Sequence, residues 1–466
     1  MHKALVALPA LLLAGCQMAP PHVRPALPTA PAYAADDAGD VAAGVRASEI
    51  GWREFFADPR LEALVTAALA RNRDLSVAVA QIEEARGQYR IQDADRLPTP
   101  GVDGSATRSR ANSGLPGTGP VTGNRYAVGV GISGFELDFW GRVRNLSEAA
   151  RAQYLATVEA ERAFRLSLIR DVASAYLASR EAEERIALAE ATVKSRNDGL
   201  RIAQLRLNAG VTSALDFRQS ESLLTQAETE LAALKLAKAQ SDNFLAVLVG
   251  GPMDAALPDG LPLDAQLKAP QLSAGLPSDL LVARPDILAA EERLRAARAN
   301  IGAARAAFFP RISLTGNLGF ASNALDNLVG DDGLAWSFGP TISLPIFDFA
   351  RNQGNLTVAR AREDIAVANY EKAVQGAFRE VSDALAGRRH LAEQVAAQQR
   401  GTEAQRRIAD LARVRYREGV ANYLEVLDAE RNLFSAEQAL LQLRRQEVDN
   451  LVGLYVALGG GTFETR

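Results

Sequence analysis

The chain has 466 residues, a formal net charge of −4 and 23% charged residues. Acidic and basic residues are nearly balanced, which gives no electrostatic argument for binding nucleic acid. One cysteine excludes an internal disulfide, and the isolated histidines His2, His22 and His390 predict no metal site. A hydrophobic content of 48% is enough for a substantial core, and the length allows roughly two to four domains.

The N-terminus has the features of a bacterial lipoprotein signal. A basic start precedes an apolar run that is too short to span a membrane, so residues 1–15 are predicted to be a signal peptide. Leu13-Ala14-Gly15-Cys16 resembles the lipobox, whose cysteine receives lipid after cleavage. Acyl chains on Cys16 would anchor the protein firmly to a membrane, and no other cofactor is expected. Gln17, in place of Asp, favours the outer membrane; an ordinary signal peptide with an incidental cysteine is the alternative.

Residues 16–60 are rich in proline and alanine and predict an extended tether between the lipid and the folded body. Trp52, Phe55 and Phe56 mark the place where packing is expected to begin.

Two proline-free stretches predict very long helices. No proline lies between Pro120 and Pro252 or after Pro345, and proline breaks helix interiors. Residues 145–208 alone would form a helix of roughly 95 Å. A seven-residue row in the second stretch indicates coiled-coil-like packing, with an ordinary helical bundle as the alternative. The row consists of Leu427, Phe434, Leu441, Val448 and Tyr455.

Four segments alternate between apolar and small or polar residues, as half-buried strands do. They begin at Val102 (the weakest), Tyr126, Ile312 and Trp336. A soluble sandwich has the same alternation, but Gly, Ser, Thr and Asn on the polar face are typical of the wetted lumen of a membrane β-barrel. Four strands have open edges that need partners, so oligomerisation is expected. In the last segment we expect one set of side chains to face lipid: Trp336, Phe338, Ile342, Leu344 and Ile346.

The chain repeats itself. The stretch around Gly419 repeats the stretch around Gly210, and Ile342-Ser343 repeats Ile132-Ser133. Each copy is predicted to contain a helix, a β-hairpin and two long helices joined by a glycine-bearing turn.

Five stretches carry a resemblance to one known family. They are the lipobox at Cys16, residues 283–287 (ARPDI), 309–314 (FPRISL), 344–356 (LPIFDFARNQGNL) and 419–440 (GVANYLEVLDAERNLFSAEQAL). Together they resemble the TolC family of outer-membrane efflux proteins, and most closely its lipoprotein members that serve RND pumps. The resemblance covers the chain from Trp52 onward.

The resemblance implies a mixed α and β homotrimer. Four strands per chain would form an outer-membrane β-barrel, which a long periplasmic α-helical barrel continues. The expected partners are a periplasmic adaptor, an inner-membrane RND transporter and outer-membrane lipid. The expected regions are repeat 1 (61–250, with a β-hairpin at 100–140 and a helical hairpin at 141–250), an equatorial linker (251–283), and repeat 2 (284–466, with hairpins at 310–347 and 351–458).

Family members close the periplasmic end with hydrophobic and acidic rings after the tip turn. The matching residues are Leu424, Glu425 and Asp428, with Arg431 at a position that is basic in some lipoprotein members. Asp216 is the first-repeat partner of Glu425. The alternative is that these charges only solvate the helix ends.

The two turns match the places where the family meets its adaptor. These tips comprise Gly210, Val211, Thr212, Gly419, Val420 and Ala421. Ala421 departs from members that carry a locking arginine there, and Arg413, Arg415 or Arg417 would have to replace it. Glycine is also what a tight turn requires, so a purely conformational role stays open.

The sequence shows no catalytic constellation and no nucleotide-binding loop. The function expected from the resemblance is passive conduction of drugs, metals or other small solutes through the outer membrane of a Gram-negative bacterium, with a gated periplasmic aperture. The alternatives are a lipid-anchored coiled coil without a pore, a periplasmic enzyme and, within the family, an exporter of proteins.

Overall fold

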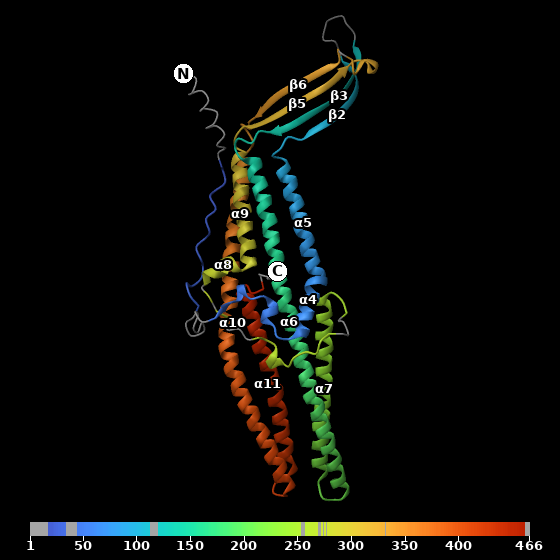
Figure 1. Ribbon diagram of the computed structural model, residues 1–466, viewed down its shortest axis with the longest axis vertical. Helices are drawn as coiled ribbons and strands as arrows, with labels where there is room; N and C mark the ends of the chain where they lie inside the picture. The colour runs from blue at the N-terminus through green and yellow to red at the C-terminus, as the bar shows by residue number, and fades with distance from the viewer. Residues whose placement is uncertain are drawn as a thin grey trace. The chain divides into compact units, whose positions relative to one another are not determined.

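The computed structural model describes most of the chain, namely residues 17–33, 44–111, 120–252, 257–268, 272–273, 275, 277–330 and 332–461. Cys16 and the predicted signal peptide lie outside these residues, so lipidation stays a prediction. The chain divides into two compact units (Figure 1). Unit 1 comprises Met1–Ala26, Gln81–Val158 and Ala289–Glu371, and unit 2 comprises Leu27–Ala80, Glu159–Leu288 and Lys372–Arg466. No helix in the described residues is both long and apolar enough to cross a membrane.

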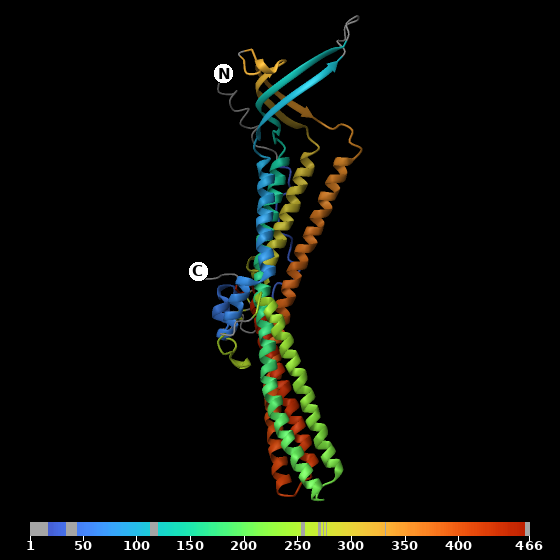
Figure 2. The same ribbon diagram turned by 90° about the vertical axis from the view of Figure 1, so that its right-hand side faces the viewer.

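Unit 1 contains a four-stranded antiparallel sheet in the order β2-β3-β5-β6 (Figures 1 and 2). The strands are β2 (Pro100–Ala111), β3 (Val121–Glu136), β5 (Arg311–Ser322) and β6 (Leu334–Ser343). All four predicted strands are therefore present, including the weakest. The last one is shorter than predicted: it ends at Ser343, whose partner Arg311 is the first residue of β5. Leu344 and Ile346 lie beyond the strand.

One face of the sheet is apolar. Paired residues in antiparallel strands point to the same side, and Val130 pairs with Leu318, which pairs with Trp336. On the other side, the row beside it joins Gly131, Asn317 and Ser337. The side chains thus separate into an apolar face and a small, polar face, as the sequence predicted.

The polar face is closely packed at one glycine, where the backbones of β3 and β5 approach each other. A Cβ atom at Gly319 would lie 2.2 Å from the carbonyl oxygen of Val128. Only glycine fits this position without displacing the neighbouring backbone.

Aromatic and charged contacts join the sheet to the helices of unit 1. The indole N–H of Trp140 donates to the Pro310 carbonyl at 2.9 Å, and its ring stacks on Phe309 at 4.7 Å. Arg142 forms a bidentate pair with Glu136 at 2.8 and 2.7 Å. The helices concerned are α5 (Arg73–Ala94), α6 (Arg142–Asn208), α9 (Pro285–Ala306) and α10 (Arg351–Arg417).

The predicted tether does not reach residue 60, because regular elements begin at Val45. Arg24 and His22 bind the nearly buried Glu291, which holds this part of the chain against α9 within unit 1. In unit 2, packing starts with β1 (Val45–Arg46), η1 (Ala47–Glu49), α3 (Trp52–Phe55) and α4 (Pro59–Arg71). Trp52 and Phe56 are buried. The tether prediction was too long because proline and alanine content does not reveal such contacts.

Unit 2 consists of two helical hairpins and a belt of short elements. One hairpin joins α6 to α7 (Ala214–Val249), and the other joins α10 to α11 (Tyr423–Ala457). α6 and α10 have 67 residues each, or about 100 Å at 1.5 Å per residue. Every member of the predicted seven-residue row on α11 is buried or half-buried, which confirms that face.

The belt contains η2 (Leu263–Ala265), β4 (Leu272–Ser273), η3 (Pro277–Asp279) and α8 (Leu280–Ala283), and β1 pairs with β4. Fully buried Asp58 connects the belt to α4 and α6 through hydrogen bonds. Its carboxylate accepts hydrogen bonds from the Tyr176 hydroxyl at 2.7 Å, the Leu261 N–H at 2.8 Å and the Gln266 amide at 2.9 Å. It also caps α4, so one side chain satisfies two elements.

Candidate functional site

The two hairpin tips of unit 2 have the same backbone geometry. Gly210 and Gly419 take positive φ angles of 70° and 77°, which favour glycine. The N–H of the valine after each glycine bonds to the carbonyl five residues earlier, closing the helix as a Schellman motif does. Val211 and Val420 are 63% and 67% exposed. Thr212 and Ala421 are half-buried. Each tip thus presents an apolar side chain on a stiff turn.

The predicted aperture residues lie at the start of α11, directly after the tip. Leu424 is 42% exposed, and Asp428, four residues later, lies on the same exposed helix face. Asp428 forms an ion pair with Arg431 at 3.1 Å, and Glu425 forms one with Arg415 of α10 at 3.4 Å. The predicted acids are therefore each paired with an arginine.

Asp216 has a local structural role in the first hairpin. It forms a capping box at the start of α7 with Ser213, and its carboxylate also accepts from the Thr212 hydroxyl at 2.7 Å. The hydrogen bonds from Thr212 and Ser213 hold the pKa of Asp216 below its usual range. Its carboxylate thus serves the helix cap, and its place in an aperture stays a prediction.

Two arginines near the tips form contacts that the sequence did not indicate. Arg206 of α6 donates to the Tyr416 hydroxyl of α10 and lies 5.2 Å from the centre of that ring. Tyr416 packs on Tyr423 at 5.0 Å. The Arg206–Tyr416 contact therefore joins the two hairpins. No spacing or motif in the sequence marks these residues as partners.

The second of these two arginines is Arg196 of α6, which is only 7% exposed. It donates to the Leu223 carbonyl at 2.7 Å and lies 5.5 Å from the Phe434 ring. Its Nε atom has no hydrogen-bond partner in the described structure. Burial lowers the pKa of its guanidinium, although the group stays charged.

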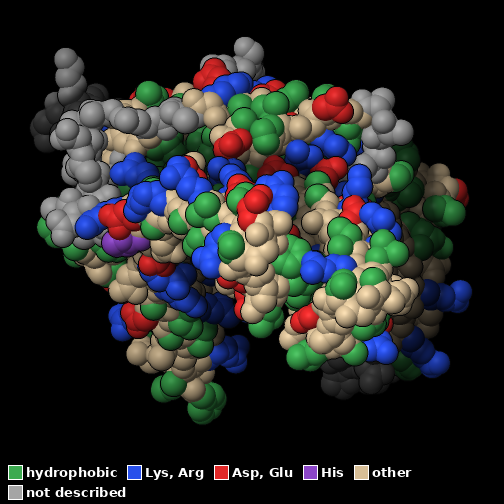
Figure 3. Space-filling view, turned by 90° about the horizontal axis from the view of Figure 1, so that it is seen from below, with side chains coloured by type: hydrophobic (Ala, Val, Ile, Leu, Met, Phe, Trp, Pro, Cys, Tyr) green, Lys and Arg blue, Asp and Glu red, His purple; other side chains and the backbone are tan. Residues whose placement is uncertain are grey.

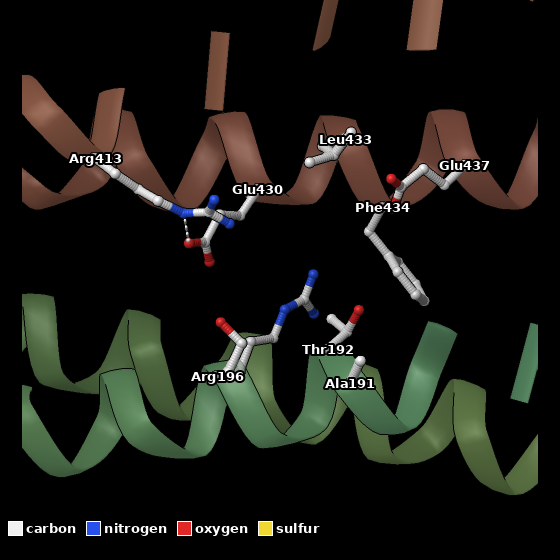
Figure 4. Close-up of a pocket in the computed structure, with 9 residues that line it drawn as sticks. Ala191, Thr192, Arg196, Arg413, Glu430, Leu433, Phe434 and Glu437 are labelled. Carbon is white, nitrogen blue, oxygen red and sulfur yellow. Dashed lines mark hydrogen bonds and ion pairs between the residues drawn. The ribbon is translucent and has the colours of Figure 1, made fainter. Parts of the chain in front are cut away.

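Arg196 points into a cavity of about 170 Å³ between α6 and α11 (Figure 4). Across it, Arg413 and Glu430 form an ion pair at 3.0 Å. The lining consists of Ala191, Thr192, Ser195, Arg196, Arg413, Glu430, Leu433, Phe434 and Glu437. The lining carries two arginines and two glutamates, so opposite charges balance.

The charges around the tips are mixed. Viewed from below, basic and acidic side chains are interspersed (Figure 3). Among the described residues, no group of three or more His, Cys, Asp or Glu is placed to hold a metal ion. The ends of the hairpins thus carry paired charges of both signs.

Comparison with known proteins decides the family. The sequence matches the outer membrane efflux protein family over residues 64–251 and 276–460, in two segments that correspond to the internal repeat. The chain belongs to this family.

Curated relatives agree along nearly the whole chain. It is 41% identical over 453 residues to the cation efflux system protein CusC of Escherichia coli K12, covering 97% of this chain and 98% of CusC. It is 42% identical over 467 residues to the toluene efflux pump outer membrane protein TtgI of Pseudomonas putida, covering 98% of each.

Solved structures agree as well. The open state of the Neisseria gonorrhoeae MtrE outer membrane channel superposes with a TM-score of 0.89 at 40% identity, covering 96% of this chain and 99% of that one. A membrane protein from Pseudomonas aeruginosa gives 0.89 at 41%, covering 95% and 100%.

These relationships confirm the predicted family, fold class and outer-membrane location. The protein is an outer-membrane channel of the kind that serves tripartite efflux pumps, and the family conducts passively without catalysing a reaction. The coiled coil without a pore and the periplasmic enzyme are thereby excluded.

Proposed function

We propose that three copies of the chain form one conduit across the outer membrane, working with a periplasmic adaptor and an inner-membrane RND transporter. The sheet of unit 1 carries the argument. β2 and β6 are its two edges, and neither pairs with another strand in the described residues. Open edges inside a membrane leave backbone groups without partners, so the edges must pair with other copies.

The assembly is tested by native mass spectrometry of the detergent-solubilised protein. The expected mass is three times that of the mature chain. A monomer or dimer that still conducts in planar bilayers would overturn the proposal.

The solutes proposed for this channel are small molecules and ions, because relatives of similar identity are described as cation and toluene efflux proteins. Selection among them would fall to the pump. The test is expression with its own adaptor and transporter in a strain that lacks efflux channels. Resistance to organic solvents or toxic cations should rise, whereas unchanged resistance to both would contradict the proposal.

We place the periplasmic aperture at Leu424, Glu425 and Asp428, with Arg431 and Asp216 beside it. The exposed face shared by Leu424 and Asp428 supports this, since an apolar and an acidic ring would then follow one another along a pore. Arg415 takes the place of the missing locking arginine, because it is the candidate that pairs with Glu425.

Adaptor docking is proposed at the tips, Gly210-Val211-Thr212 and Gly419-Val420-Ala421. The exposed valines on stiff turns support it. Val211→Asp with Val420→Asp should abolish co-purification with the adaptor. Leu236→Asp is the matched control, because Leu236 is 60% exposed on α7 and far from the turn in sequence. Equal loss in the control would refute docking at the tips.

Lipidation of Cys16 remains part of the proposal. Mass spectrometry of the mature N-terminus should find an acylated cysteine. In Cys16→Ala the lipid should be lost while the trimer still inserts, since the sheet has its own apolar face. An unmodified cysteine, or a mature chain that starts elsewhere, would refute it.

A further inference from the structure

A pair of arginines lies at the far end of the sheet, away from the helices of unit 1. Arg108 and Arg110 are near the end of β2, and both are exposed. They pair with Asn124 and Thr122 of β3. Neither forms an ion pair or side-chain hydrogen bond within the described part of the chain. Both residues are exposed on the strand.

The strand register places both arginines on the apolar face. Val102, Arg108 and Arg110 are separated by even numbers of residues, so their side chains point to the same side of β2. Val102 pairs with Val130 in the row that continues to Leu318. The arginines therefore project toward lipid, whereas the small, polar face is on the opposite side.

The order of rows gives the depth of the pair in the membrane. The last apolar row joins Phe320 and Leu334, and the next row holds Tyr126, an aromatic residue of the type that marks the membrane interface. Counting only the rows on this face, which are two residues apart, Arg108 lies one row and Arg110 two rows beyond Tyr126. With a strand tilt of 35–45°, that is about 5 and 10 Å above Tyr126. The headgroup layer on each side of a bilayer is about 5–7 Å thick.

The local charge is positive at this end. From Asn112 to Pro120 the sequence contains no acidic residue, and the nearest acid on β2, Asp103, lies on the opposite face because it pairs with Gly129. The connection between β5 and β6 instead carries three aspartates in its sequence, Asp326, Asp331 and Asp332. The basic character is therefore confined to the β2–β3 end of the sheet.

We infer that Arg108 and Arg110 form a docking site for phosphate groups of outer-leaflet lipid. The long periplasmic helices attach to the opposite end of the sheet, so the arginines face the exterior leaflet. Guanidinium groups bind phosphate through paired, charge-assisted hydrogen bonds. Arg108 at headgroup depth, with Arg110 one row above it on the same lipid-facing side, would recognise a phosphorylated lipid such as lipid A and anchor each copy against vertical movement. The inference depends on the membrane orientation of the sheet.

The test measures binding of fluorescent bisphosphorylated lipid A in mixed detergent micelles to the purified full-length protein. An arginine near an anionic lipid surface contributes about a factor of five in affinity, so Arg108→Gln with Arg110→Gln should lower it by about 25-fold. Arg125→Gln is the matched control: Arg125 pairs with Thr107 on the opposite face at the same height, and should change binding less than twofold. Lipid A without phosphates should bind the wild type as weakly as bisphosphorylated lipid A binds the double variant.

Three results would overturn the inference. They are equal affinity of the wild type and the double variant, an equal loss in Arg125→Gln, and full competition by millimolar inorganic phosphate, which would indicate a general anion site. Native mass spectrometry of the same samples reports the trimer separately, so a failure of assembly is distinguished from a failure of lipid recognition.

Discussion

The sheet geometry makes a graded prediction for charges placed on β6. Phe338 lies in the middle of the apolar face, 67% exposed and level with Gly316, whereas Ile342 lies at the strand end, level with Ile312. Their spacing of four residues corresponds to about 14 Å along the strand, or about 10 Å of depth at a tilt near 40°. Arginine near the midplane costs about 2–4 kcal/mol, and near the interface about 0–1 kcal/mol. Phe338→Arg should therefore destabilise far more than Ile342→Arg.

Ser337→Arg is the internal control, because Ser337 pairs with Asn317 on the polar face. It should cost clearly less than the change at its neighbour Phe338. The assay is guanidinium unfolding of protein reconstituted in lipid vesicles, followed by tryptophan fluorescence, with Trp336 as a reporter on the same strand. Equal costs at Phe338 and Ser337, or a larger cost at Ile342 than at Phe338, would refute the assignment of faces and depth.

Three further predictions concern unit 2. Glu425→Ala with Asp428→Ala should lower cation selectivity, and Leu424→Ala should raise resting conductance, in single-channel recordings; an unchanged cation preference would mean that these carboxylates are surface charges. Asp58→Ala should destabilise the protein by about 2–4 kcal/mol, because it leaves buried donors unsatisfied and removes a helix cap; a melting temperature within one degree of the wild type would contradict this. The ionised carboxylate of Asp216 stabilises the α7 cap, which is why its pKa is lowered; this contribution is complete at pH values above about 4 and is lost as the pH falls through the lower folded-state pKa. Amide exchange at the tip, corrected for intrinsic rates, should therefore speed up on acidification in the wild type but not in Asp216→Ala.

Local periodicity explains why much of the fold was predictable. Alternation along β5 depends only on the two-residue repeat of a strand, and the proline-free stretch after Pro345 depends only on helix geometry. The glycines at 210 and 419 were recognisable because a left-handed turn selects glycine. The tether was predicted too long because composition carries no information on long-range pairing, such as that of Val45 with Leu272.

The sequence by itself determined the two-fold repeat, the four strands, the long helices and, through the resemblance, the family. Only the tertiary structure decided which charges pair between helices. Asp428 pairs with Arg431 three residues later on α11, a spacing that the sequence itself shows, whereas Glu425 of α11 meets Arg415 because α10 packs beside it. Each residue turns a helix face by about 100°, so a shift of one position in packing changes every partner across an interface. Such contacts depend on the rotation and register of whole helices, which no local pattern encodes.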